Sequence, residues 1–273
     1  MPKTLYVTDL DGTLLNSSQR VSPRTCEIVN RLTERGMLLS CATARSRFSS
    51  ARALEGLSIC LPMIVYNGTF IQNVATGEVL HGCFLSRKTA VEIIEWYISR
   101  ELLPIVYAFV DGKEHFSYVP EHSCKALLEF VATRPGDPRT RITDPEGLKD
   151  GDIFYITAMG NEALLQEARS KFMQKEELGT IFYREIYSGD YWLEFMPAEA
   201  TKANAALRLK ELLGCQRLVC FGDAVNDIPM FRIADEAYAT ANADPQLKAI
   251  ATGIIGSNEE DAVALWLEQY GEF

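Results

Sequence analysis

Three short polar stretches of this sequence have residue types and spacings that could do chemistry. DLDGT at 9–13, TAR at 43–45 and GDAVND at 222–227 each follow an apolar run. An unpaired carboxylate in a buried strand is expensive to desolvate, so Asp9 and Asp11 need a reason to stand there. Residues two apart on a strand point to the same side, and we therefore expect both carboxylates to address one small volume.

A cation is expected where these carboxylates meet. If Asp223 joins Asp9 and Asp11, each like-charge pair at about 4 Å costs roughly 4 kcal/mol at an effective dielectric near 20. The three stretches offer oxygen ligands and contain neither His nor Cys, which suits Mg²⁺ better than zinc or copper. A hydroxyl, an amide and an ammonium group are available for the oxygens of a phosphoryl group, on Thr43, Asn226 and Lys202. The sequence therefore predicts a site for a phosphate dianion.

Alternating strands and helices must position these stretches. The first part of the chain has an apolar run at 5–8, a helix capped by Ser22 and ending at Gly36, and further apolar runs at 37–42 and 63–66. Repeated strand–helix–strand units indicate a parallel sheet with helices on both faces. Ligands bind outside the carboxyl ends of such strands, so we expect the three stretches to share one edge.

The middle of the chain breaks this alternation. Short extended runs at 70–72 and 78–80 predict a hairpin. The order that follows is helix, two strands, helix, strand, helix and two strands, which predicts an inserted unit with a mainly antiparallel sheet. Alternation returns with a helix at 202–213 and a strand at 218–221. The core is thus predicted to be discontinuous, with both ends of the chain folding together around the insertion.

These motifs, in this order, resemble the haloacid dehalogenase superfamily of Mg²⁺-dependent phosphatases, and within it the Cof-type sugar-phosphatase group. The resemblance covers nearly the whole chain and rests on DLDGTLL at 9–15, ATAR at 42–45, YNG at 66–68, Lys202 in EATKANAAL and FGDAVNDIPM at 221–230. It implies an α/β fold, with a Rossmann-like parallel sheet as the core and an α+β cap domain inserted between the second and third motifs. The expected boundaries are 1–82 and 189–273 for the core and 83–188 for the cap.

The resemblance also implies roles for individual residues. Asp9 is the expected nucleophile and Asp11 the general acid and base. Mg²⁺ is expected to bind Asp9, the backbone carbonyl of Asp11, and Asp223, with Asp227 supporting the metal's surroundings. Phosphate is expected to be held by Thr43, the backbone amides of Leu10 and Ala44, Lys202 and Asn226. Gly12 and Thr13 are expected to shape the turn. Two departures from the family pattern are ATAR in place of ATGR, and Ala203 where Gly is frequent.

The expected activity is Mg²⁺-dependent hydrolysis of small phosphorylated metabolites, in particular sugar phosphates, through an aspartyl-phosphate. The cap is expected to supply specificity, although its Tyr107, Tyr155 and Trp192 are assigned to its own core. Two alternatives stay open. A phosphomutase could use the same aspartyl-phosphate, and a regulator could bind a phosphorylated metabolite without turnover. Arg45 is expected either to bind substrate or to pair with a nearby carboxylate, and Asn67 either to form a turn or to contact substrate.

Composition sets the remaining expectations. The formal net charge is −10 over 273 residues with no run of Lys or Arg, which disfavours nucleic acid and anionic membranes as partners. The apolar run near the N-terminus is too short for a signal peptide, and no segment approaches the roughly 20 apolar residues of a membrane span. The seven cysteines form no C-x-x-C pair and are expected to be reduced thiols. We therefore expect a cytoplasmic protein.

Overall fold

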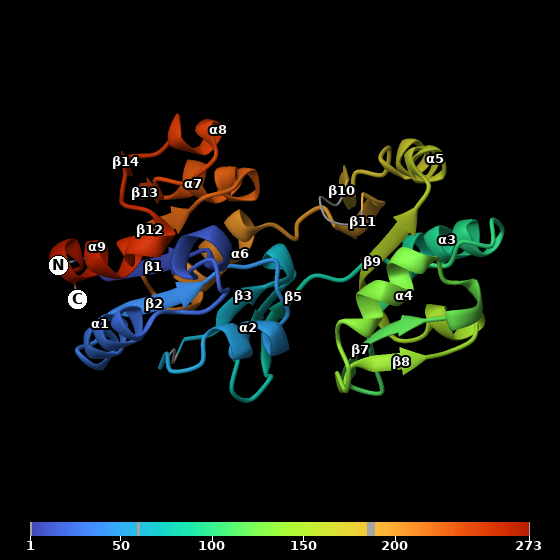
Figure 1. Cartoon of the computed structure of the whole chain (residues 1–273), viewed down its shortest axis with the longest axis horizontal. Coiled ribbons are helices and arrows are strands. Elements are labelled where there is room, and N and C mark those ends of the chain that lie inside the picture. The colour runs from blue at the N-terminus through green and yellow to red at the C-terminus, as the bar shows by residue number, and fades with distance from the viewer. Residues whose placement is uncertain (1, 59–60, 185–188, 273) are drawn as a thin grey trace. The chain divides into compact units, whose positions relative to one another are not determined.

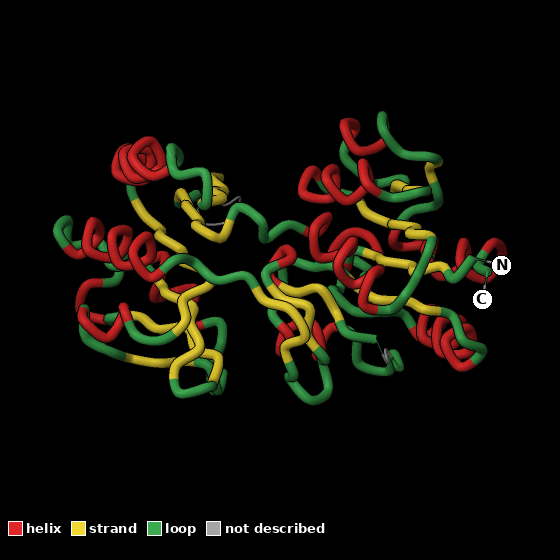
Figure 2. The backbone as a smooth tube through the Cα atoms, turned by 180° about the vertical axis from the view of Figure 1, so that it is seen from behind, coloured by secondary structure: helices red, strands yellow, loops and turns green. Residues whose placement is uncertain are grey.

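The structure is a computed structural model that describes residues 2–58, 61–184 and 189–272. The chain forms two compact units (Figure 1). The core consists of Met1–Gly82 and Ala200–Phe273, and the cap is Cys83–Glu199. Both units combine helices with strands, drawn red and yellow in Figure 2. The core is therefore discontinuous in sequence.

A parallel sheet of five strands forms the centre of the core. Its order is β14 (Gly253–Ile254), β13 (Glu236–Ala239), β12 (Arg217–Gly222), β1 (Thr4–Thr8) and β2 (Leu38–Cys41). Strand β1 lies between β12 and β2 and is buried along its whole length, and Thr8 at its end pairs with Phe221 on one side and Cys41 on the other. This arrangement confirms the predicted α/β fold with a Rossmann-like parallel sheet.

Helices cover both faces of this sheet. One face packs α6 (Lys202–Leu212) and α7 (Ile228–Ile233) against buried strand residues such as Leu5 and Val7. The strand residues between these point to the opposite face of the sheet, where Tyr6 and Phe221 contact Trp266 of α9 (Ala262–Tyr270). The other core helices are α1 (Pro23–Glu34), α2 (Arg47–Ala53) and α8 (Pro245–Lys248). The period of two along each strand thus provides an apolar surface on both faces of the sheet.

The predicted helix start and hairpin in the first part of the chain are both confirmed. Ser22 accepts the backbone N–H of Thr25, which caps α1 ahead of Pro23. Strands β4 (Phe70–Gln72) and β5 (Val79–Gly82) pair antiparallel, and β4 also pairs with β3 (Met63–Val65). A single parallel bridge between Ala42 and Ile64 connects this small sheet to the end of β2.

The cap is built on a sheet of six strands. Its order is β10 (Leu178–Arg184), β11 (Tyr191–Pro197), β9 (Asp152–Gly160), β6 (Ile105–Val110), β7 (Lys113–Tyr118) and β8 (Thr140–Ile142). All neighbours pair antiparallel except β7 and β8. Helices α3 (Arg87–Ile98) and α5 (Glu162–Phe172) bury one face, and α4 (Lys125–Ala132) packs on the other. Tyr155 is buried, and Tyr107 and Trp192 pack on the cluster beneath α4, as expected.

The predicted end of the cap at residue 188 is corrected to Glu199. Strand β11 lies beyond residue 188 and pairs with both β9 and β10, so it belongs to the cap sheet. Of the two strands expected at the end of the insertion, the first, over residues 181–187, corresponds to β10 as far as Arg184, and residues 185–187 lie outside the described residues. Two strands, β8 and β14, were not predicted, because each is only two or three residues long and lies in a turn-rich or polar segment.

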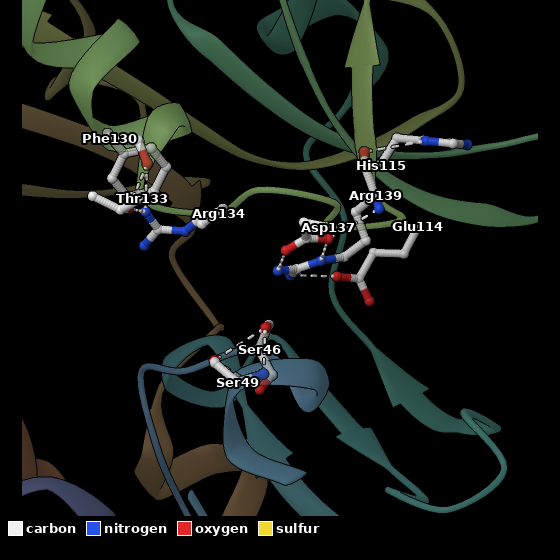
Figure 3. Close-up of polar contacts among 9 residues, drawn as sticks. All are labelled: Ser46, Ser49, Glu114, His115, Phe130, Thr133, Arg134, Asp137 and Arg139. Carbon is white, nitrogen blue, oxygen red and sulfur yellow. Dashed lines mark hydrogen bonds and ion pairs between the residues drawn. The ribbon is translucent and has the colours of Figure 1, made fainter. Parts of the chain in front are cut away.

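A buried charge network stabilises one end of the cap sheet. Arg139 is 6% exposed, and its guanidinium contacts Glu114 at 3.0 Å and Asp137 at 2.6 Å (Figure 3). Nearby, the guanidinium carbon of Arg134 lies 3.5 Å from the ring centroid of Phe130 (Figure 3). Each buried charge of the network therefore has an opposite charge in direct contact, as buried ion pairs require.

Two further expectations can be compared with the structure. None of the helices in the described part of the chain is long and apolar enough to cross a membrane. The six cysteines among the described residues are thiols that form no disulfide bond with one another, and Cys60 lies outside those residues.

Candidate active site

The three polar stretches meet at the carboxyl edge of the core sheet. Strands β12, β1 and β2 are neighbours and run parallel, so their ends at Gly222, Thr8 and Cys41 lie side by side. Asp9 follows β1 directly, and Asp223 follows β12. The sheet order therefore brings together residues more than 200 positions apart in sequence.

A tight turn separates Asp9 from Asp11. Strand β1 ends at Thr8, and residues Leu10–Leu14 form one π-type turn in which Gly12 has a φ of 71°. The strand alternation that we invoked for the two aspartates is therefore wrong, because they do not lie on a strand. Instead Asp9 is buried, whereas the side chain of Asp11 is 50% exposed.

Gly12 is required by the close approach of a second carboxylate. A Cβ at this position would lie 2.1 Å from Oδ2 of Asp223, far inside van der Waals contact. The next residue, Thr13, donates from its hydroxyl to Oδ1 of Asp223 at 3.1 Å. These two residues thus shape the turn, and the turn holds Asp223 in place.

Lys202 lies between two buried aspartates. It is the first residue of α6 and only 2% exposed, and its Nζ lies 2.8 Å from Oδ1 of Asp9 and 2.7 Å from Oδ1 of Asp227. Burial lowers the pKa of Lys202, but the charges of Asp9 and Asp227 outweigh it and raise the pKa above its ordinary value. The ammonium group is therefore held in its charged form.

Asp227 is fixed by the backbone of its own loop. Its Oδ2 accepts the N–H groups of Asp223 and Ala224 at 3.1 and 3.2 Å, and the residue is fully buried. A Cβ on Gly222 would lie 2.6 Å from the same oxygen, so the loop can only close on glycine. Asp227 thus holds the ammonium group of Lys202 in place. The family resemblance implied only that Asp227 supports the surroundings of the metal.

The site carries more negative than positive charge. Asp9, Asp223 and Asp227 each offer a carboxylate oxygen, and these atoms lie within 4.8 Å of one another. Burial and the charge of Asp227 raise the pKa of Asp9 to about 8, although Lys202 and the backbone of Leu10 oppose the shift. Burial and Asp227 likewise raise the pKa of Asp223 to about 6. The ligand atoms that this group offers are all oxygen, and among the described residues Lys202 is the cation that forms ion pairs with it, so the group fits a hard divalent ion such as Mg²⁺.

Arg45 pairs with Asp11. Its Nε lies 2.7 Å from Oδ2 and its Nη2 2.5 Å from Oδ1 of Asp11, a bidentate contact, and Nη2 also donates to Oε1 of Gln19 at 3.0 Å. The hydrogen bonds to Asp11 raise the pKa of Arg45. Of the two roles expected for Arg45, the structure thus shows the pairing with a carboxylate, which fixes the orientation of the Asp11 side chain.

The other predicted phosphate ligands surround the turn formed by YNG at 66–68. Thr43 is fully buried, its hydroxyl accepts the N–H of Arg45 at 3.1 Å and its carbonyl accepts the N–H of Asn67 at 2.9 Å. Asn226 donates from Nδ2 to Oδ1 of Asn67 at 3.3 Å. Ala44 is exposed. Among the described residues, no hydrogen bond connects Thr43 or Asn226 directly to Asp9.

Two residues that sequence reasoning missed hold the turn after β1. Asn242 donates from Nδ2 to the carbonyl of Gly12 at 2.8 Å, and the hydroxyl of Thr240 contacts the same oxygen at 3.4 Å. Both follow β13, whose carboxyl end lies at the same edge of the sheet. In the sequence they follow the short run AYA at 237–239, and this is the signal that could have identified them.

Replacement of Gly68 by alanine should destabilise the core. Gly68 has a φ of 105°, and a Cβ would lie 2.2 Å from the carbonyl oxygen of Thr201, the N-cap of the helix that carries Lys202. We expect Gly68→Ala to lower the free energy of unfolding by about 3 kcal/mol in urea denaturation. Gly36→Ala is the matched control, because Gly36 has the same φ and a Cβ there would have nothing within 4 Å. Equal losses for both variants would show that close packing on Thr201 is unimportant.

Comparison with known proteins places the chain among characterised relatives. A family model described as haloacid dehalogenase-like hydrolase matches residues 6–267. The 5-amino-6-(5-phospho-D-ribitylamino)uracil phosphatase YwtE of Bacillus subtilis is 24% identical over 96% of each chain. The HMP-PP phosphatase of Cronobacter sakazakii is 29% identical, over 96% of this chain and 93% of its own length. A crystal structure of a Thermotoga maritima protein has the same fold, with a TM-score of 0.80 at 21% identity over 100% of this chain and 99% of that one.

Proposed function

The chain belongs to the haloacid dehalogenase-like hydrolase family, and on that premise we propose that it is a Mg²⁺-dependent phosphatase of small phosphorylated metabolites that works through an aspartyl-phosphate. The relatives from Bacillus subtilis and Cronobacter sakazakii are phosphatases and match almost the whole chain. Fold and family alone do not assign a reaction to individual residues. The proposal therefore rests on the chemistry of the site.

The observation that carries the proposal is the buried Lys202 between Asp9 and Asp227, beside Asp223. A structural ion pair would need one carboxylate for one ammonium, whereas this cluster collects three carboxylates around a single Lys. Such an excess of buried negative charge is costly unless a cation completes it. Together, an ammonium and a divalent cation suit a phosphate dianion and the charge that develops when it is transferred.

In the first step, a carboxylate oxygen of Asp9 attacks phosphorus, and the bond between phosphorus and the ester oxygen breaks. Asp11 is the proposed general acid, which donates a proton to the departing alkoxide, so an alcohol leaves. Lys202 favours the ionised form of Asp9, because its charge opposes the rise in the pKa of that carboxyl, and it stabilises the negative charge of the phosphoryl oxygens. The product of this step is a mixed anhydride between phosphate and Asp9.

In the second step, water attacks the phosphorus of the aspartyl-phosphate. Asp11, now a carboxylate, takes a proton from this water, and the bond between phosphorus and the Asp9 oxygen breaks. Inorganic phosphate leaves and both aspartates return to their starting forms. Arg45 holds the Asp11 side chain by two hydrogen bonds, which restricts its orientation for the proton transfers.

Asp9, Asp223 and the backbone carbonyl of Asp11 are the proposed ligands of Mg²⁺. When bound, the ion supplies Lewis-acid stabilisation of phosphoryl charge and orients the phosphate group. Asp227 is already occupied by Lys202 and two backbone amides, so it is assigned to Lys202 in this proposal.

Metal removal should abolish phosphate release. We expect EDTA to reduce turnover to background and added Mg²⁺ to restore it, because three close carboxylates cannot all stay ionised without the cation. Mg²⁺ should also raise the melting temperature, since a ligand that binds only the folded state stabilises it. Asp223→Asn should lose this thermal shift, and Asp235→Asn, a change at the opposite edge of the sheet, should keep it. Full turnover in EDTA would contradict the assignment.

A panel of phosphorylated sugars, nucleotides and cofactors tests the reaction itself. Release of phosphate from members of the panel supports the phosphatase. Conversion of a hexose monophosphate to its isomer without release of phosphate would identify a phosphomutase. Binding of a phosphorylated metabolite without either reaction would identify a regulator. Sugar phosphates are our first choice of substrate, and compounds that combine a heterocycle with a sugar-like chain follow because a relative of this length acts on one.

A further inference from the structure

A cavity lies in the core, apart from the three carboxylates of the candidate active site. It measures about 760 Å³, within the range of about 300–1,000 Å³ that is typical of small-molecule sites. Residues of β13, β14 and α9 line it, and so do Arg217 and Glu236 at the amino ends of β12 and β13 (Figure 1). Among the described residues that line this cavity, none belongs to the active site.

Aromatic rings form one wall of the cavity. The ring centroids of Tyr238 on β13 and Trp266 on α9 are 4.4 Å apart, and those of Trp266 and Tyr270 are 5.5 Å apart. Trp266 and Tyr270 share one face of α9, because residues four apart are neighbours on a helix. These rings continue the buried cluster of Tyr6 and Phe221, but Tyr270 is 56% exposed. The wall therefore ends in a ring that solvent or a ligand can reach.

The cavity also carries an excess of negative charge. Glu236, Glu260 and Glu272 line it, and Arg217 is the one cationic side chain among the described residues that do so. Arg217 forms ion pairs with Glu236 and Glu272. Glu260 instead accepts the backbone N–H and the hydroxyl of Ser257 with Oε2, at 2.8 and 2.9 Å. Three carboxylates thus share a single guanidinium, and the partners of Glu260 are neutral groups.

Glu260 keeps both its charge and a free oxygen. The hydrogen bonds from Ser257 lower the pKa of Glu260, and the hydrogen bond from the Tyr238 hydroxyl lowers the pKa of Glu236, so both carboxyl groups are ionised at neutral pH. Within the described residues, Oε1 of Glu260 accepts no hydrogen bond, although a carboxylate can accept about four. The cavity therefore offers an anionic acceptor beside aromatic rings.

A structural role explains only part of this arrangement. The ion pairs of Arg217 connect β12 with β13 and with the end of the chain, and the capping box of Ser257 and Glu260 stabilises the turn before α9. Neither role needs the exposed ring of Tyr270 or the surplus carboxylate. The surplus charge also selects the occupant, because it repels anions and opposes docking of a second copy, which has a net charge of −10 itself.

We propose that this cavity binds a small organic cation, in which an ammonium group is attached to a flat apolar body. The ammonium group donates to the free oxygen of Glu260, and the flat body lies against the rings of Trp266 and Tyr270. A cation above an aromatic ring gains further attraction from the electrons of the ring face. This inference goes beyond the proposed phosphatase function and uses no step of that reaction.

Tyramine and tyrosol test whether the charge is required. The two compounds share a phenol ring and an ethyl chain, and differ in an ammonium group that replaces a neutral hydroxyl. In calorimetric titrations of the native protein, we expect one tyramine to bind per chain, with a Kd at least about tenfold lower than that of tyrosol. Equal affinities for the two compounds, or no binding of tyramine, would overturn the proposal.

Two substitutions test the location of the bound cation. Tyr270→Ala removes an exposed ring, and Glu260→Gln removes a charge but keeps an oxygen that can accept from Ser257. We expect each to raise the Kd of tyramine about threefold or more. Glu259→Gln is the matched control, because Glu259 accepts the N–H of Ser17 and does not line the cavity. It should change the Kd less than about twofold, and equal effects of the two Glu variants would contradict the assigned contact.

The indole N–H signals in nuclear magnetic resonance give a second readout of location. The chain has three tryptophans, of which Trp96 and Trp192 lie in the cap. Tyramine should shift the signal of Trp266, which is identified by its loss in Trp266→Phe, and leave the two cap signals in place. Asp223→Asn should bind tyramine as the native protein does. Binding that is lost in Asp223→Asn but unchanged in Tyr270→Ala would place the cation in the active site and overturn the proposal.

Discussion

Replacement of Asp9 by asparagine is expected to reduce phosphate release by roughly 10⁴-fold or more, because the amide cannot attack phosphorus and no other group takes over a lost nucleophile. The fold should survive, since Lys202 keeps its contact with Asp227 and the change removes one of three close carboxylates. Phosphate release under saturating substrate measures the loss, and thermal denaturation measures the fold. Intact-protein mass spectrometry after acid quench should detect a phosphoryl adduct on the native protein that is missing in the variant.

Asp235→Asn is the matched control for this loss. Asp235 also lies in the core and contacts a lysine, Lys210 at 3.3 Å, but it precedes β13 and therefore stands at the opposite edge of the sheet. We expect this variant to keep turnover within about twofold of the native protein, as expected for a change away from the site. Appreciable phosphate release by Asp9→Asn would remove Asp9 from the role of nucleophile.

Replacement of Lys202 by methionine should cost both stability and activity. Methionine fills a similar volume but leaves Asp9 and Asp227 buried without their counter-charge. Breaking a buried ion pair from one side typically costs about 3–5 kcal/mol, and we expect a loss of unfolding free energy in this range in denaturant titrations. Turnover should fall by roughly 10³-fold, because a positive charge at the phosphoryl group is lost.

Lys210→Met separates this effect from the loss of any lysine on α6. Lys210 lies on the same helix and pairs with Asp235, whose side chain is 49% exposed, so its removal should cost less than about 1 kcal/mol. Adding Asp227→Asn to Lys202→Met should recover part of the stability, since it removes one of the uncompensated charges. Similar losses for the two lysine variants would mean that Lys202 does not neutralise the site.

Much of the core could be predicted from the sequence because its signals are local. The cap of α1 at Ser22, the apolar run of β1 and the hairpin at β4 and β5 each depend on a few neighbouring residues. The parallel order then follows from the alternation of strands and helices. The motifs shared with the family also indicated that the site lies at the carboxyl edge of the sheet, independently of the strand and helix pattern. These parts of the prediction succeeded because local propensity and tertiary context agree there.

The prediction was less accurate where strand pairing depends on distant residues. The sequence pattern predicts a strand at β11, but the predicted end of the cap at residue 188 comes before that strand. Only the pairing of β11 with β9 and β10 assigns it to the cap. Similarly, strand alternation does not apply to Asp9 and Asp11, because β1 ends at Thr8, one residue before Asp9. Exact ends of elements are decided by tertiary hydrogen bonds that the sequence pattern does not contain.

By itself, the sequence determined which chemical groups are present and at which edge of the sheet they stand: carboxylates after β1 and β12, a hydroxyl after β2, and a lysine at the start of α6. Only the tertiary structure decided how they are paired. It places Lys202 between Asp9 and Asp227 and pairs Arg45 with Asp11. The physical reason is that burial and charge pairing depend on contacts between residues far apart in the chain, and the cost of a buried charge is set by those contacts.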